Sequence, residues 1–343
     1  MKSIILSLLF VYFSASHLNA QTARIDKVKF FEDTSILKAT ITTNIAKLFN
    51  KKNKTGIHFP ARFLITLPDG TTIDDNLSME VRGHFRKGYC YIPPLKIHFK
   101  SQKTSPLKTL GSLKLVSQCS LAFFSETYLL DEYLIYKIYN LLTNMSFRVR
   151  LLKITFEDSL GKKKPMNEYA FLMEDEKDLA SRNNCTDWKK GDIGDQGTDR
   201  HQMTTVALFE YMIGNTDWSV FAGHNIKLLL SKTDSFQHFY PVPYDFDYSG
   251  FVNTNYATPD PRLNISSVRE RVYRGYPRTI EELDEALEVF KNQKNNIYSL
   301  INNFQLLNSR DKKDLTFYLD QFFDLINHPE QVKDAFIRNA RRD

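Results

Sequence analysis

Alternating apolar and polar positions dominate the part of the chain after residue 57 and predict β-strands. Within Pro94–Phe99, for example, the apolar side chains fall on one face, while Lys96 and His98 fall on the other. This period of two is typical of a half-buried strand. The strands stop at turn residues such as Pro68-Asp69-Gly70. Four strands of an antiparallel sheet are expected here: Ala61–Leu67, Leu77–Arg82, Pro94–Phe99 and Leu113–Val116.

The period then changes to that of a helix. Apolar residues recur at helical spacing between Ser125 and Leu142, which predicts a long amphipathic helix. Arg148–Phe156 and Tyr169–Met173 follow as two further strands, separated by a polar turn that contains Gly161. We expect these two strands to form a hairpin that delivers Glu174 at its end.

The remainder of the chain reads as mainly helical. Residues 181–198 are polar and rich in glycine, and they predict a mobile surface loop. A helix is expected over Asp199–Ile213, ended by Gly214. Further helices fill the chain after Thr279, which forms a capping box with Glu282.

A hairpin is expected inside the segment Gly214–Gly250. Two β-like runs, Asn225–Leu230 and Phe236–Pro243, flank a polar turn over residues 231–235. Paired strands lie about 4.8 Å apart, so the residues before the first strand should lie near those after the second.

This hairpin should bring four oxygen-bearing side chains to one end of a sheet. Asp217 and Asn225 precede or open it, and Asp245 and Asp247 follow it. Carboxylate and amide oxygens are the ligands that Mg²⁺ prefers. Turn residues of these types are also common without any ligand, because their side chains bond their own backbone. The order of the set favours a metal site.

These elements predict an α+β protein with a strand-rich front part and a helical back part. We expect a signal peptide over residues 1–20, a lead-in segment over 21–57 and one domain over 58–343. Within that domain, 58–178 is the β-rich part and 179–343 is the mainly helical part.

The first twenty residues have the pattern of a secretory signal. Lys2 gives the positive start, Ile4–Phe13 the apolar core, and Leu18-Asn19-Ala20 the small residue at a cleavage site. The apolar run is too short to span a bilayer. The mature protein is therefore expected to be secreted or periplasmic, without a membrane span.

Composition and charge narrow the classes of function. The chain has 343 residues, of which 42% are hydrophobic and 25% charged, as in ordinary globular proteins. Its net charge of +6 is spread along the sequence, which does not indicate a nucleic-acid binder. The three cysteines allow one disulfide, and Cys90 with Cys119 is one pairing. Buried thiols are the equal alternative.

The candidate residues fit the requirements of phosphoryl transfer. That chemistry needs a lysine for the phosphates, an acidic partner for the lysine, a base near the acceptor hydroxyl, and metal ligands. Lys96 on its strand and Glu174 at a strand end offer the first two parts. Asp217, Asn225 and Asp245 follow in the order of a base, a metal-binding Asn and a metal-binding Asp around a hairpin.

Over about residues 60–250, the chain resembles the spore-coat CotH family (spore coat protein H) of atypical, secreted kinases. The order and spacing of short segments carry the resemblance, which is best toward residue 250. The segments are Arg82-Gly83, Pro93-Pro94-Leu95-Lys96-Ile97, Tyr169-Ala170-Phe171-Leu172-Met173-Glu174, Gly214-Asn215-Thr216-Asp217, His224-Asn225 and Pro243-Tyr244-Asp245-Phe246-Asp247.

The resemblance implies an atypical kinase-like fold with two lobes, an antiparallel β-rich N-terminal lobe and a helical C-terminal lobe. It also implies an ATP- and Mg²⁺-dependent protein kinase that phosphorylates a protein hydroxyl. Asp217 would then be the catalytic acid-base or orienting carboxylate. Asn225 and Asp245 would hold Mg²⁺, with Asp247 as a competitor of Asp245 for that role.

The resemblance further implies a nucleotide-binding set in the front part. Lys96 would contact nucleotide phosphates, with Glu174 as its partner or as a further metal ligand. Arg82 and Arg86 would also meet phosphate, because arginine binds oxyanions with two parallel donors. Two departures stand out: there is no glycine-rich phosphate loop, and the interval of eight residues between Asp217 and Asn225 exceeds that of ordinary kinases.

Two other classes of function remain open from the sequence. One is a catalytically inactive binding or structural protein on a kinase-like scaffold, which the missing glycine loop favours. The other is a metal-dependent hydrolase that uses His201 and His224 with the same acids.

Overall fold

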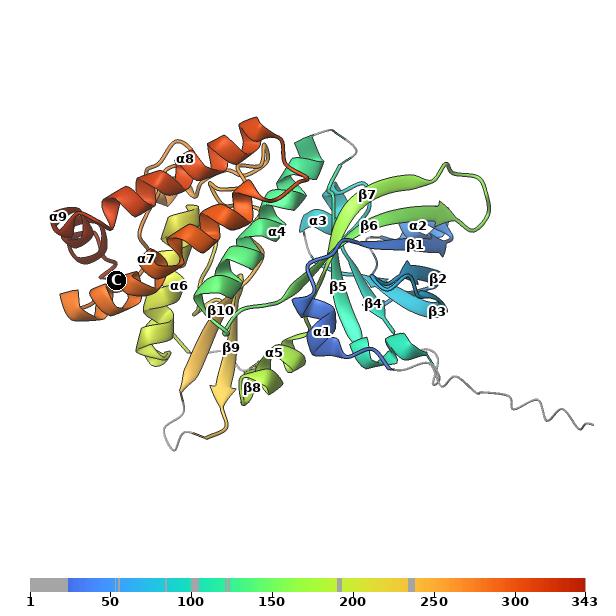
Figure 1. Cartoon of the computed structure of the whole chain (residues 1–343), viewed down its shortest axis with the longest axis horizontal. Coiled ribbons are helices and arrows are strands. Elements are labelled where there is room, and N and C mark those ends of the chain that lie inside the picture. Colours follow the sequence, from blue (N-terminus) through green and yellow to red (C-terminus); the bar gives the residue numbers. More distant parts are fainter. Residues whose placement is uncertain are drawn as a thin grey trace, which may run out of the picture.

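The structure is a computed structural model that describes residues 24–342 apart from 53, 55, 84, 100–104, 121, 123, 190–192 and 234–237. The expected signal peptide over residues 1–20 lies outside the described residues. Figure 1 shows a strand-rich part on one side of the molecule and a helix-rich part on the other. Within the part of the chain that is described, no helix is both long and apolar enough to cross a bilayer.

Seven strands form a closed barrel in the order β1-β2-β3-β4-β5-β7-β6. Most neighbours pair antiparallel, but β1 pairs with β6 in parallel and this pairing closes the barrel. The strands are β1 (Leu37–Thr43), β2 (His58–Thr66), β3 (Thr72–Val81), β4 (Leu95–His98), β5 (Ser112–Ser117), β6 (Val149–Asp158) and β7 (Met166–Met173).

The barrel interior is filled by the apolar residues of the alternating strands. Ile41, Phe63, Ile97 and Leu113 are all fully buried within one cluster. The opposite residues of the same strands face outward, which is why Lys96 and His98 lie on the outer surface of β4. Small helices cover the ends and edges of the barrel: α1 (Lys27–Glu32), α2 (Ile45–Lys51), α3 (Phe85–Tyr89) and η1 (Pro106–Leu110).

A second, three-stranded sheet lies outside the barrel, in the order β10-β9-β8. It consists of β8 (Cys185–Trp188), β9 (Ile226–Ser231) and β10 (Phe239–Pro243), and β9 pairs antiparallel with both neighbours. The expected hairpin is therefore confirmed. Part of the segment expected as a mobile loop over 181–198 is the strand β8 instead.

Helices build the rest of the molecule around this sheet. The long helix α4 (Phe124–Leu142) packs between β6–β7 and α7 and is buried on most of its circumference. The others are α5 (Glu176–Arg182), η2 (Asp195–Gly197), α6 (Arg200–Ile213), η3 (Pro261–Leu263), α7 (Ile280–Asn302), α8 (Ser309–Leu325), α9 (Pro329–Lys333) and the π-helical turn η4 (Asp334–Arg338).

Two helix ends follow the local sequence signals. Gly214 ends α6 in the left-handed conformation, with φ 66°, and its N–H donates to the last turn of the helix. Thr279 and Glu282 form the expected capping box at the start of α7. Gly214 thus ends the helix at the residue before Asn215, where the candidate loop begins.

The expected α+β class is confirmed, but the kinase-like fold with two lobes is wrong. The front part is a closed barrel and not an open antiparallel sheet, because β1 closes it through the parallel pair with β6. The back part is not only helical, since it contains the β8–β9–β10 sheet. The segment 21–57, expected as a lead-in, supplies β1 and so contributes to the barrel.

A disulfide joins Cys90, after α3, to Cys119, after β5. From the sequence, this disulfide and buried free thiols were equal alternatives. The bond closes a loop of 29 residues and fixes the short helix α3, which carries Arg86, against the barrel.

Candidate functional site

A tight turn brings Asp217 and Asn225 together after helix α6. Ser219 and His224 exchange backbone hydrogen bonds of 2.9 Å, which folds the chain back on itself. The side-chain amide of Asn225 donates to the Asp217 backbone carbonyl at 2.7 Å and to Asp217 Oδ2 at 3.1 Å. The long interval between the two residues is therefore accommodated by the turn. Both amide protons face Asp217, so the carbonyl oxygen of Asn225 is the atom left for a cation.

Asp217 is also bound to a histidine. His224 Nε2 lies 2.8 Å from Asp217 Oδ1, and both side chains are partly exposed. The two oxygens of this carboxylate therefore have different partners, a histidine on one side and an amide on the other. These two partners fix the orientation of the Asp217 carboxylate.

Asp245 and Asp247 follow β10 and have different environments. The Asp245 N–H donates to Tyr136 Oη of α4 at 2.9 Å, and its side chain is half-buried. Asp247 is buried, with one oxygen accepting from Tyr256 Oη at 2.9 Å and lying 3.8 Å from an Arg86 nitrogen. The more accessible Asp245 is thus the better placed of the two to receive a cation from solvent.

Asn225 and Asp245 share a rare backbone conformation. Their φ angles are 52° and 68°, in the left-handed region that non-glycine residues seldom adopt. Asn and Asp adopt this conformation more readily than other non-glycine residues, and Asn184, Asn253 and Asn264 have it elsewhere in the described chain. Asn225 and Asp245, the expected metal ligands at the two ends of the hairpin, both have this conformation.

The carboxylates lie close enough to perturb one another. Burial raises the pKa of Asp247, and the neighbouring charge of Asp245 raises it further. Asp217 adds a smaller rise, while Arg86 lowers this pKa. Glu132 of α4 belongs to the same cluster: burial raises its pKa, and Asp247 and Asp245 add to the effect against Arg86. Asp245, Asp247, Glu132 and Arg86 therefore share one electrostatic environment.

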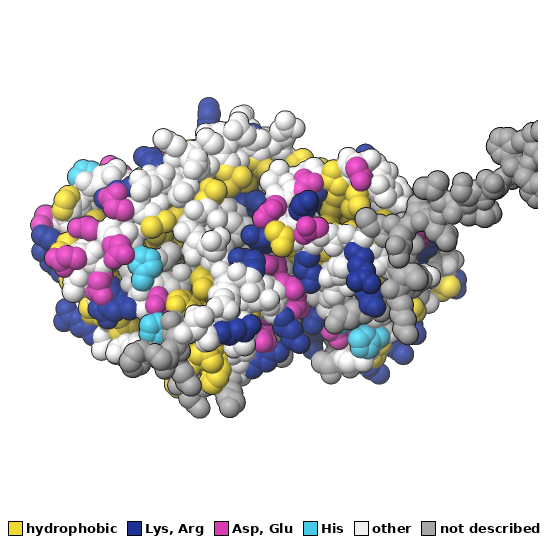
Figure 2. Space-filling model, turned by 60° about the horizontal axis from the view of Figure 1, so that its bottom comes forward, with side chains coloured by type: hydrophobic (Ala, Val, Ile, Leu, Met, Phe, Trp, Pro, Cys, Tyr) yellow, Lys and Arg dark blue, Asp and Glu magenta, His cyan; other side chains and the backbone are white. Residues whose placement is uncertain are grey.

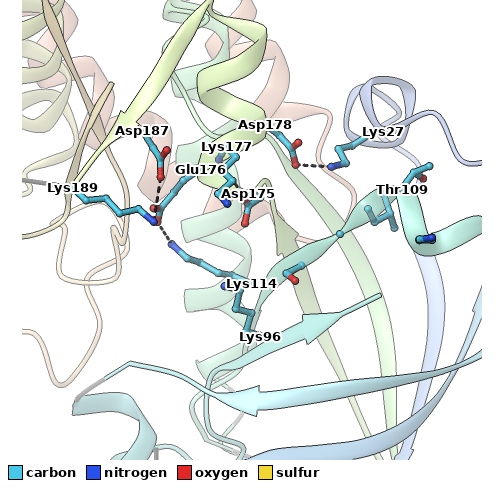
Figure 3. A pocket seen from close by; sticks show the side chains of 14 residues that line it. Lys27, Lys96, Thr109, Lys114, Asp175, Glu176, Lys177, Asp178, Asp187 and Lys189 are labelled. Carbon is cyan, nitrogen blue, oxygen red and sulfur yellow. Dashed lines mark hydrogen bonds and ion pairs between the residues drawn. The ribbon is translucent and has the colours of Figure 1, made fainter. Parts of the chain in front are cut away.

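A cleft lined with lysines lies between the barrel strands and helix α5. Its volume is about 440 Å³, and strands β4 and β5, η1 and α5 form its walls. Figure 3 shows Lys96 and Lys114 on neighbouring strands, with the Lys114 ammonium directed at Glu176. Lys114 Nζ lies 3.1 Å from Glu176 Oε1, and Lys227 Nζ of β9 lies 3.5 Å from the same atom.

Lys114 and Lys227 converge on the residue before Asp245. Their Nζ atoms lie 5.0 and 5.2 Å from the centroid of the Tyr244 ring. Burial lowers the pKa of Lys114, with Glu176 opposing it, while the two lysines hold the pKa of Glu176 below its usual value despite burial. Two cations thus lie on the ring of Tyr244, the residue that precedes Asp245 in the sequence.

A second cavity of about 490 Å³ continues the first and shares Glu176, Asp187 and Lys189 with it. Apart from Lys227, its other lining residues are mainly apolar and include Trp188 and the 73%-exposed Phe221. In Figure 2, basic and acidic side chains intermingle along the middle of the drawn face, between the barrel and the helical part. Charged and apolar side chains thus line two adjoining cavities, which suits a ligand with a phosphate end and a ring end.

The expected pair of Lys96 and Glu174 is not formed. Glu174 is buried and binds Arg182 at 2.9 and 3.1 Å, and it also accepts the Arg148 N–H. Lys96 lies in the cleft wall directly opposite Lys114. Glu174 therefore holds α5 against the barrel, and Glu176 is the acid that meets a cleft lysine.

The arginines are placed near the acidic cluster. Burial lowers the pKa of Arg82, and the charge of Asp245 opposes this fall most strongly. Asp247 and Glu132 likewise raise the pKa of the buried Arg86 against the effect of burial. Both expected phosphate contacts thus lie within electrostatic range of the expected metal ligands.

Of the histidines considered for hydrolysis, only His224 contacts a candidate acid. His201, at the start of α6, has Nδ1 at 3.8 Å from Glu285 Oε1 of α7 and contributes nothing to the Asp217 cluster. His224 is held on Asp217, as described above.

Sequence reasoning missed Lys114, Glu176, Glu132 and Tyr136. A signal for Lys114 existed: it occupies the polar face of an alternating strand, like Lys96, and adjacent antiparallel strands place such residues side by side. For Glu132 and Tyr136 the helical period predicted only packing, since burial on nearly all sides of α4 is not visible in a sequence.

No protein-family model matches the chain, and no curated protein matches it at the threshold of significance.

Proposed function

We propose that this protein is an exported phosphotransferase that moves the γ-phosphoryl group of ATP, with Mg²⁺, to a protein hydroxyl. A single observation carries the proposal. Asp217 and Asn225 are hydrogen-bonded before the β9–β10 hairpin, and Asp245 and Asp247 follow it within electrostatic range of Asp217. Lys114 and Lys227 contact the ring of Tyr244, the residue before Asp245. Acidic metal ligands next to lysines that neutralise phosphate are the two halves of such a site.

Each residue has a defined part in this proposal. Asp245 and Asn225 hold Mg²⁺, which supplies charge neutralisation and alignment of the phosphates when bound. Asp247 is the competing ligand. Lys114, oriented by Glu176, meets the phosphate oxygens together with Lys227.

The transfer itself then needs little covalent chemistry from the protein. The acceptor oxygen forms a bond to the γ-phosphorus, and the bond between that phosphorus and the β,γ-bridging oxygen breaks to release ADP. Asp217 accepts the hydroxyl proton, with His224 and Asn225 fixing the carboxylate. Lys96 and Arg82 remain candidates for further phosphate contacts from the cleft wall and the acidic cluster.

The proposal includes a distant relationship to the CotH family of secreted kinases. It rests on the ordered motifs of the sequence, from Arg82 to Asp247, and on the proximity of several of their residues. A secreted or periplasmic location is part of it. The Cys90–Cys119 disulfide supports this, since such bonds persist in oxidising compartments.

A second candidate function is favoured by the bond between His224 and Asp217. A histidine held on a carboxylate at 2.8 Å, beside metal ligands, also suits hydrolysis of a phosphoester. This alternative predicts phosphate release from a generic ester without ATP.

Incubation with γ-labelled Mg-ATP and a mixture of acceptor proteins tests the proposal. We expect label on protein with the unmodified chain, and none with Asp217→Asn, which keeps the size of the side chain but removes the base. Asp320→Asn, on the exposed side of α8, is the matched control and should leave transfer unchanged. Absence of transfer together with ester hydrolysis would favour the second candidate, and absence of both would leave a binding protein.

A further inference from the structure

Three ligand-type side chains meet on the outer face of the barrel, away from the acidic cluster. His58 is on β2, Glu80 on β3 and His98 on β4. One ligand atom of each lies within 4.8 Å of the other two. Among the described residues, this is the one group of at least three His, Cys, Asp or Glu side chains that meets so closely. On the barrel side of the face in Figure 2, histidine lies at the surface beside acidic and basic side chains.

Strand register explains the meeting. His58 is the direct partner of Glu80 across β2 and β3, and His98 follows two residues after Lys96, the partner of Glu80 on β4. All three face outward, because residues two apart on a strand share a face. Direct and diagonal cross-strand neighbours lie within reach of long side chains. The strands of a rigid barrel therefore hold the three groups in place.

We propose that His58, Glu80 and His98 form a Zn²⁺ site, with water as the fourth ligand. Two imidazoles and one carboxylate are a donor set that zinc takes in open, tetrahedral coordination. Imidazole nitrogen favours zinc and its neighbours over Mg²⁺ and Ca²⁺, which prefer oxygen alone. The site is thus chemically distinct from the oxygen-only cluster at Asp245. It also stands independently of the proposed phosphotransfer.

The geometry around His98 already resembles that of a ligand. Its Nδ1 lies 2.8 Å from Ser112 Oγ on β5, so this second hydrogen bond fixes the ring. Metal-binding histidines are commonly oriented in this way through the nitrogen that does not bind the metal. The other nitrogen, Nε2, is buried and makes no hydrogen bond within the described part of the chain, although Glu80 Oε1 lies 3.2 Å away.

The two imidazoles are adjacent and so can share one ion. The ring centroids of His58 and His98 are 5.3 Å apart, with a tilt of 49° between the rings. Lys96, the neighbour of Glu80 across the strand pair, brings a positive charge to the same face. Affinity must therefore come from the nitrogen donors more than from net charge.

A bound ion would join β2, β3 and β4 on the wall that Lys96 and Ser112 share with the lysine-lined cleft. Zinc therefore stabilises that wall, because an ion that binds only the folded state raises stability in proportion to its concentration over Kd.

Calorimetric titration of the chelator-stripped protein with Zn²⁺ tests the site. We expect one equivalent to bind and the melting temperature to rise by several degrees. His58→Gln and Glu80→Gln should each weaken binding at least ~10-fold, and Ser112→Ala should do so by about 10-fold through His98. Co²⁺ in place of Zn²⁺ should give the visible absorption of a tetrahedral complex.

His201→Gln is the matched control, since that exposed histidine lies on α6 beside Glu285. It should leave Zn²⁺ binding unchanged. Binding that survives both His58→Gln and Glu80→Gln, or that falls equally in His201→Gln, would overturn the proposal. So would the absence of a bound equivalent in folded protein, with folding checked by circular dichroism.

Discussion

Asn225 donates its side-chain amide to both the backbone carbonyl and the carboxylate of Asp217, eight residues earlier in the chain. This contact holds the start of strand β9 against the loop that follows helix α6. It also directs the carbonyl oxygen of Asn225 away from Asp217. The expected base and the expected metal ligand are therefore positioned by each other.

Two substitutions of Asn225 separate the contribution of its backbone conformation from that of its side chain. Asn225→Gly tolerates the φ of 52°, so we expect it to lose only the stability from the amide hydrogen bonds, about 1 kcal/mol, and the affinity for Mg-ATP to fall at least ~10-fold. Asn225→Ala should lose the same affinity and in addition about 1 kcal/mol of stability, because alanine is strained at positive φ. Calorimetric titration and urea unfolding measure the two effects. Equal affinity of Asn225→Gly and the unmodified chain would contradict the ligand role.

The two lysines of the cleft offer a paired test. Lys114→Met removes the cation that Glu176 orients beside Tyr244, so we expect nucleotide affinity to fall by at least ~10-fold. Lys96→Met is the matched control, since this lysine lines the same cleft directly opposite on β4. We expect it to cost less than Lys114→Met. A larger loss of nucleotide affinity with Lys96→Met, measured by calorimetry, would indicate that Lys96 makes the main phosphate contact.

A buried carboxyl in the barrel makes stability depend on pH. Glu168 of β7 is 7% exposed, and burial raises its pKa to about 8 from the usual 4.5. The folded state therefore keeps a proton that the unfolded chain releases above that usual value. This contribution to stability is complete below about pH 4.5 and is lost as pH rises through 8, at up to about 1.4 kcal/mol per pH unit.

Glu168→Gln should flatten this pH dependence, since glutamine does not titrate. Urea unfolding at pH 5 and pH 8 measures the difference. Glu281→Gln, on the exposed side of α7, should leave the slope as in the unmodified chain. The same slope in Glu168→Gln and the unmodified chain would assign the pH dependence to other groups.

Much of the fold could be predicted because the signals are local. The alternation in β4 and β5, the helical period of α4 and the glycine after α6 each depend on residues close in sequence. The hairpin that brings the candidate acids together is equally local.

Closure of the barrel could not be predicted, because it depends on a parallel pairing between β1 and β6. More than a hundred residues separate these strands, and neither strand contains a sequence pattern that identifies its partner. β1 also lies in a segment with no obvious role in the sequence. Long-range pairing of this kind leaves no local pattern.

The arrangement of the candidate site residues could be predicted only in part, because it too depends on contacts between distant parts of the chain. Lys96 and Lys114 both lie on polar faces of neighbouring strands, and only the position of α5 decides which of them meets an acid. Similarly, Glu174 and Glu176 are two residues apart, and Arg182 binds the first of them. The turn after Asp217 was harder still, since its length alone suggested that Asn225 lay out of reach.

Binding of Mn²⁺ in the presence of ATP, followed by electron paramagnetic resonance, tests the shared metal site most directly. Mn²⁺ replaces Mg²⁺ at oxygen ligands. The account predicts a nucleotide-dependent bound ion in the unmodified chain and in Asp320→Asn, and its loss in Asp245→Asn. A nucleotide-dependent Mn²⁺ signal of unchanged affinity in Asp245→Asn would contradict it.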